Sequence, residues 1–141
     1  MPSTAIYDFT NVKLEPAMAP DLARTISVLL KPSTTFVKGT ILGEITASPG
    51  VYTNYDHTQN DGTQVPKGIL AYDVVTDAAG NPTGLTYPYP PWPDLGVPMY
   101  VKGFFNSADI WSATELAQAL TVAGWGALVQ GNATTGVFRM G

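Results

Sequence analysis

The sequence predicts a mainly β protein: a compact barrel- or sandwich-like domain with one short helix near the C-terminus and an extended N-terminal arm. Short runs rich in β-branched and aromatic residues recur along the chain, and turn formers such as Ser48-Pro49-Gly50 and Asp61-Gly62 separate them. The length of 141 residues suits one ordinary domain. Frequent short strands with turns between them favour an all-β barrel or sandwich over a helical or α/β protein.

The first 24 residues combine isolated apolar side chains with prolines. Pro16 and Pro20 exclude a continuous helix or a central strand there. We interpret the segment as an extended arm, with a disordered tail as the alternative. Tyr7 and Phe9 alternate with polar residues, which is the pattern of a short strand whose aromatic side can pair with another chain.

The body of the chain contains strand-like runs at regular intervals. They occupy residues 25–31, 35–47, 51–55, 68–76, 97–105, 127–130 and 137–140. The run over residues 69–75 is apolar on both faces except at Asp73, as expected for a strand that is covered on both sides. The stretch 36–75 carries no obvious set of catalytic side chains and reads as a rigid β scaffold.

One segment breaks the β pattern. Ser112 and Glu115 form a capping box and Gly124 supplies a stop, so we expect a helix over residues 113–123. Its apolar residues fall on one face at helical spacing: Ala113, Leu116, Ala117 and Leu120. We expect this face to pack over an open end of the β domain.

The composition restricts the class of function. Charged residues make up only 13% of the chain, about half of the roughly 25% that is typical of soluble domains, so we expect partners to cover part of the surface. The net charge is −4 without a basic patch, which argues against direct nucleic-acid binding. There is no cysteine for a disulfide or thiolate site. We find no secretory signal and no membrane-spanning run, and we expect synthesis in the cytoplasm.

The residues that carry chemistry are sparse. Asp56 and His57, with Asp61 nearby, are the best candidates for a general base or half of a metal site. They stand in a loop rich in Asn, Thr and Gln, where such residues are ordinary turn formers. The sequence therefore predicts no enzyme, no cofactor, no catalytic residues and no metal site.

A proline-rich segment over residues 87–93 presents Tyr87, Tyr89 and Trp92 on a stiff, polyproline-like loop. Such aromatics can contact another subunit or the partner surface, because stiff loops present them at low entropic cost. Two alternatives stay open: a loop folded onto its own domain, and a platform for a sugar or peptide. The last would make the chain a carbohydrate- or peptide-binding β module.

Several motifs in a fixed order resemble the lambdoid phage head decoration proteins. These are KGTILGEI at residues 38–45, DGTQ at 61–64, GILAYDV at 68–74, YVKGFFN at 100–106, and the later short helix. The resemblance covers residues 35–141. It implies a β-tulip-type fold and a structural virion protein that binds the exterior of the expanded capsid as trimers, at threefold or quasi-threefold sites, and stabilises it.

The resemblance also implies a division of the chain and a set of partners. Residues 1–24 would be the capsid-binding arm and residues 25–141 the β decoration domain, with the major capsid protein and two further copies of the chain as partners. The protein would lie on the outer surface of the virion, with no nucleic acid or membrane as partner. The implied arm contacts are Ile6, Tyr7, Phe9, Val12 and Leu14.

Overall fold

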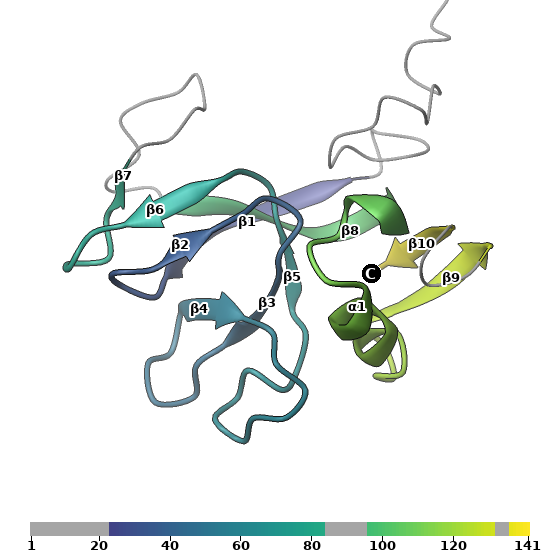
Figure 1. The fold of residues 1–141 in the computed structure, drawn as a ribbon, viewed down its shortest axis with the longest axis horizontal. Coiled ribbons are helices and arrows are strands. Elements are labelled where there is room, and N and C mark those ends of the chain that lie inside the picture. Colours follow the sequence, from purple (N-terminus) through teal and green to yellow (C-terminus); the bar gives the residue numbers. More distant parts are fainter. Residues whose placement is uncertain (1–22, 84–95, 132–135) are drawn as a thin grey trace, which may run out of the picture.

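The computed structural model describes residues 23–83, 96–131 and 136–141, and it is mainly β (Figure 1). The larger sheet contains β1 (Arg24–Leu30), β3 (Ile41–Glu44), β4 (Val51–Asn54), β5 (Gly68–Leu70), β8 (Val97–Asn106), β9 (Gly126–Gln130) and β10 (Val137–Met140). The smaller sheet contains β2 (Thr35–Phe36), β6 (Val74–Thr76) and β7 (Pro82–Thr83). A 3₁₀ turn, η4 (Ser107–Asp109), precedes the helix α1 (Ala113–Ala119). The predicted mainly β class with one short helix near the C-terminus is confirmed.

The larger sheet curls into a barrel-like ring. The order of its strands is β1-β4-β3-β5-β8-β10-β9, and β1 also pairs with β8. The strands β1, β4, β3, β5 and β8 therefore form a ring, with β10 and β9 extending from β8. The parallel junction of β1 with β4 consists of two residue pairs, Leu29 with Val51 and Leu30 with Tyr52. Because this junction is so short, the sheet is not a continuous closed barrel.

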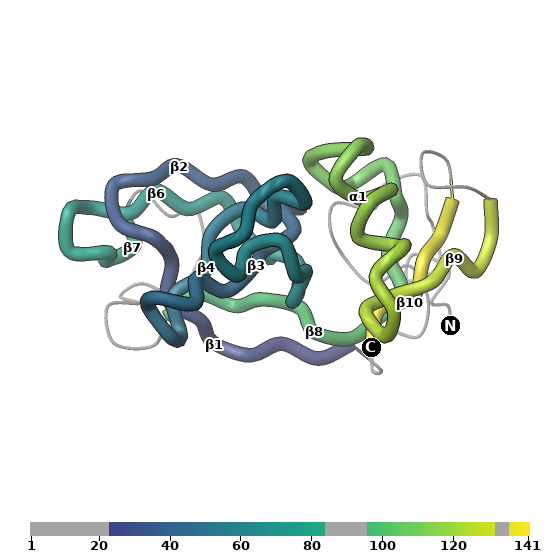
Figure 2. The backbone as a smooth tube through the Cα atoms, turned by 90° about the horizontal axis from the view of Figure 1, so that it is seen from below, coloured from purple at the N-terminus to yellow at the C-terminus, as the bar shows by residue number. Residues whose placement is uncertain are grey.

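The long strand β8 connects the two ends of the molecule. Its first half pairs with β1 on one side and β5 on the other, and its last four residues pair with β10. The strands β2, β6 and β7 lie at one end, α1, β9 and β10 lie at the other, and β3 and β4 lie between them (Figure 2). β1 runs alongside β8 between them.

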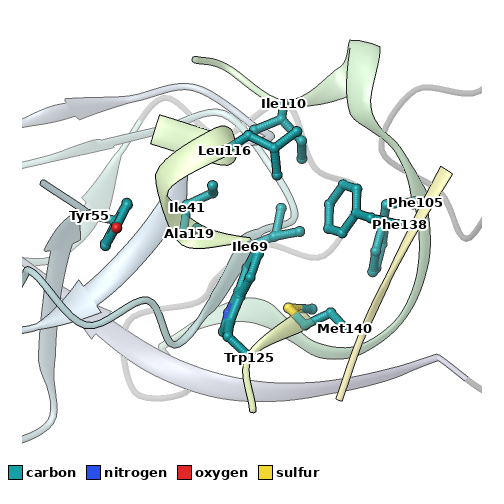
Figure 3. Close-up of a cluster of buried hydrophobic side chains, with 10 residues drawn as sticks. All are labelled: Ile41, Tyr55, Ile69, Phe105, Ile110, Leu116, Ala119, Trp125, Phe138 and Met140. Carbon is teal, nitrogen blue, oxygen red and sulfur yellow. The ribbon is translucent and has the colours of Figure 1, made fainter. Parts of the chain in front are cut away.

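Two hydrophobic clusters lie on opposite sides of β3 and β5. Ile41 and Ile69 belong to the first cluster, and their sequence neighbours Leu42 and Leu70 belong to the second. Successive residues of a strand point to opposite faces. Each of these two strands therefore contributes one fully buried side chain to each of the two cores. The first cluster (Figure 3) contains Ile41, Tyr55, Ile69, Phe105, Ile110, Leu116, Ala119, Trp125, Phe138 and Met140. The second contains Val28, Leu30, Phe36, Leu42, Leu70, Val74, Val97 and Met99.

Glycine is required where these elements approach closely. Gly39 has a φ of +87°, and a Cβ there would collide with the carbonyl oxygen of Asp109. Its N–H donates to the Leu70 carbonyl at 2.9 Å, and its carbonyl accepts from the N–H of Trp111 at 3.1 Å. Gly39 therefore joins β5 to the segment that leads into α1.

Two of the predicted strands are shorter than expected. The run 35–47 divides into β2 and β3 because the chain turns at Val37–Thr40, where the Thr40 N–H donates to the Val37 carbonyl. The run 68–76 divides into β5 and β6, because Asp73 turns outward and its carboxylate accepts the N–H of Lys38 at 2.8 Å. The expectation of one strand buried on both faces is correct for Ile69, Leu70 and Ala71, whereas Val75 is exposed.

The helix is also shorter than predicted, ending at Ala119 with Leu120 as its C-cap. Ser112 is the N-cap, and its side chain accepts the N–H of Glu115 at 3.2 Å, as the capping box predicts. The buried face consists of Leu116 and Ala119, whereas the expected core residues Ala113 and Ala117 are exposed. None of the described helices is long and apolar enough to cross a membrane.

Candidate functional site

The predicted contact residues lie outside the described part of the chain. This holds for the arm residues Ile6, Tyr7, Phe9, Val12 and Leu14, and for the loop residues Tyr87, Tyr89 and Trp92. The described structure begins at residue 23 and shows where this residue lies. Ala23 lies beside Gly103, 3.5 Å from the position of a Cβ there, and Gly103 pairs with Met140 of β10. The described part of the chain therefore begins next to the pairing of β8 with β10.

The strand β9 forms an end of the larger sheet. It pairs with β10, and within the described residues its other edge has no strand partner. Its sequence, GALVQ, contains no charged residue, and Leu128 and Val129 are 42% and 51% exposed. Edge strands of soluble proteins usually carry lysine, proline or another protecting feature that blocks pairing with a second chain. The exposed edge of β9 is therefore a candidate interaction surface.

A second candidate is a group of polar side chains where the loop after β4 meets α1. The N–H of His57 donates to Oε1 of Glu115 at 3.0 Å, and Nδ1 of His57 lies 2.6 Å from Oε2 of the same carboxylate. Asp56 completes the group, in which one ligand atom from each residue lies within 4.8 Å of the others. We call these three residues the 56–57–115 cluster.

Hydrogen bonds hold the carboxylates of this loop in their charged form. The pKa of Asp56 is lowered by the side-chain hydroxyl and then the N–H of Thr58, which donate to Oδ1 at 2.6 and 3.0 Å. The pKa of Asp61 is lowered in the same way by Thr63. Burial raises the pKa of Tyr55, and the negative charges of Glu115 and Asp56 raise it further. The cluster is therefore a region of negative potential beside a neutral phenol.

The sequence pattern identifies only two of the three residues of this cluster. It placed Asp56 and His57 together but suggested Asp61 as the nearby acid, whereas Asp61 bonds to Thr63 and is not part of the cluster. The partner from α1 is Glu115, 58 residues away along the chain. The local pattern marks Glu115 only as a capping residue, and no local signal connects it to His57. With two carboxylates and one imidazole, the cluster can form an ion pair or bind a cation.

Comparison with known proteins identifies one family. The family model described as bacteriophage lambda head decoration protein D matches residues 18–88, half of the chain. The match includes β1 to β7 and ends before β8, so the YVKGFFN motif and the helix lie outside it. No curated protein and no solved structure matches the chain significantly.

Proposed function

The chain belongs to the family of the bacteriophage lambda head decoration protein D, and on this premise we propose that it binds the exterior of the expanded phage capsid as a homotrimer and stabilises the shell. The family is one of structural capsid proteins, located on the virion, and not an enzyme family. The observation that carries the proposal is the match over residues 18–88. The binding positions that we propose are the threefold and quasi-threefold sites, and the partner is the major capsid protein.

We assign capsid binding to the arm over residues 1–24 and the body of the trimer to residues 25–141. The strand-like alternation around Tyr7 and Phe9 suits the addition of a strand to a sheet edge of the capsid protein. Tyr87, Tyr89 and Trp92 are the second proposed contact, with either the capsid or a neighbouring subunit.

The β9 edge supports self-association. An uncharged edge strand with two exposed apolar side chains can add to the sheet of a second copy, which would remove Leu128 and Val129 from water. The low charged fraction of 13% agrees with a surface that is partly covered by partners. We therefore propose β9 as a contact between subunits of the trimer.

A trimer with three arms can stabilise a capsid because its binding is linked to the equilibrium between the unexpanded and expanded shell. A ligand that binds only the expanded shell shifts the equilibrium toward that state by mass action. Three linked arms convert weak single contacts into a durable attachment, because the second and third binding events are intramolecular. The proposal thus requires no chemistry beyond association.

Co-sedimentation tests capsid binding. Purified protein is mixed with expanded, undecorated capsids, and the bound fraction is measured in the pellet. We expect saturable binding by the full chain and loss of binding on deletion of residues 1–15, with the unfolding transition of the β domain unchanged. Failure of the full chain to co-sediment would overturn the proposed function, whereas binding by the truncated chain would overturn only the assignment to the arm.

A further inference from the structure

The 56–57–115 cluster brings together ligand groups from two separate parts of the fold. Asp56 and His57 follow β4, and Glu115 stands in the first turn of α1. Their ligand atoms lie within 4.8 Å of one another. Ligands at about 2.0–2.2 Å from a tetrahedral ion lie roughly 3.3–3.6 Å apart, so the most distant of these ligand atoms must approach one another by up to about 1.5 Å.

The donor set selects a class of ion. One imidazole nitrogen with carboxylate oxygens suits zinc and the neighbouring transition metals, whereas calcium and magnesium prefer ligands that are all oxygen. The His57 side chain is about one third exposed, at 33%, and that of Glu115 is 14% exposed. Water can therefore reach the cluster to complete the coordination.

Neighbouring groups hold the ligands in place. Thr58 donates two hydrogen bonds to Oδ1 of Asp56, and Gln59 lies 3.5 Å from Oδ2. The backbone N–H of His57 holds Oε1 of Glu115, and the N-cap fixes the backbone of Glu115 through Ser112. Such supporting contacts orient metal ligands and contribute to affinity.

From this arrangement we propose that Asp56, His57 and Glu115 bind one divalent transition-metal ion of the zinc class. The ion takes the place of the hydrogen bond between Nδ1 of His57 and Oε2 of Glu115. For a neutral imidazole, the proton that Nδ1 donates moves through solvent to Nε2, so that Nδ1 offers its lone pair to the metal. Bound metal then links the loop after β4 to α1, which stabilises the domain because the ion binds the folded chain.

His57 is the only histidine of the chain, which makes the test selective. Metal-free full-length protein is titrated with Zn²⁺, while the imidazole resonances of His57 are followed by NMR and stoichiometry is measured by calorimetry. We expect one ion per chain, saturable shifts of the His57 signals and a higher midpoint of thermal unfolding. An equal concentration of Ca²⁺ should produce none of these effects.

Variants separate this site from adventitious binding. Glu115→Gln and Asp56→Asn should each weaken Zn²⁺ binding by at least the roughly 10-fold that loss of a supporting group costs. Asp61→Asn is the matched control, an acid of the same loop outside the cluster, and should bind as the unmodified chain does. The proposal is overturned if the His57 signals do not move with Zn²⁺, or if Asp61→Asn weakens binding as much as the two cluster variants.

Discussion

Gly39 joins β5 to the segment that leads into α1, so its substitution tests how closely these parts pack. We predict that Gly39→Ala is more destabilising than Gly50→Ala, although both glycines have a φ of +87°. At Gly50 no atom lies within 4 Å of the added methyl group, so the cost is the left-handed backbone alone, about 1 kcal/mol. At Gly39 the methyl group also meets the Asp109 carbonyl, which adds about 1–3 kcal/mol.

Urea unfolding of the two variants measures this difference directly. Because φ is the same at both positions, the difference in free energy of unfolding reports mainly the close approach of Gly39 to η4. Equal losses of stability in the two variants would show that this contact is not tight.

The free energy of unfolding should depend on pH through Asp61, in a direction that follows from the hydrogen bonds of this residue. Thr63 lowers the pKa of Asp61 in the folded state, so this carboxylate stabilises the protein above its unfolded pKa of about 4 and loses that contribution as the pH falls through the folded value. Asp61→Asn keeps an oxygen acceptor for Thr63 but does not titrate. We predict that the stability difference between the two proteins shrinks as the pH is lowered from 6 to about 2, as measured by denaturant unfolding at each pH. A constant difference would contradict the assignment.

The residues of the 56–57–115 cluster show what local sequence can and cannot predict. Asp56 and His57 are adjacent, so the pattern placed them together. Glu115 reaches them only because α1 packs against the body through Leu116 and Ala119. A tertiary contact over 58 residues leaves no trace in the local spacing.

At the scale of elements, the helix and most strands could be predicted because their signals are local. Ser112 caps the helix, and alternating or continuous apolar runs mark β1, β4 and β8. The sequence does not predict the break at Ala71–Asp73, because Ala71 and Tyr72 continue the apolar run, whereas the break at Val37–Thr40 falls on Lys38-Gly39, a turn signal inside the predicted run. The strand β7 was missed because Asn81-Pro82 is a turn signal, and its pairing with β6 is set by the fold.

At the scale of a single strand, the open edge of β9 should determine whether the chain self-associates. We expect Val129→Lys to lower the mass of the associated protein in sedimentation analysis, because a charge on an edge strand opposes pairing with a second chain. Val75→Lys is the control, since Val75 is also an exposed strand valine but lies in the smaller sheet. A loss of association in Val75→Lys alone would move the subunit contact to the smaller sheet.

At the scale of the whole molecule, we expect the two hydrophobic clusters to unfold together. They share β3 and β5, so we expect a loss of packing in one cluster to weaken the other. We predict that Leu70→Ala, in the second cluster, lowers the free energy of unfolding by about 2–5 kcal/mol. The fluorescence of Trp111 and Trp125, which pack in or against the first cluster, should follow the same shifted transition as far-UV circular dichroism. Two separate transitions would show that the clusters unfold independently.

The pairing of β1 with β8 has a consequence for the time that the chain needs to fold. Partners such as Val28 and Val97 are about 70 residues apart, so the ring closes only after a long loop has been brought together at an entropic cost. Chains dominated by such distant pairings fold in milliseconds to seconds, far more slowly than helical bundles. Until β8 is in place, the edges of β1, β5 and β10 that pair with it are open to other chains. Newly made protein is therefore most vulnerable to misassembly before β8 is in place, and dilute refolding should recover more native protein than concentrated refolding.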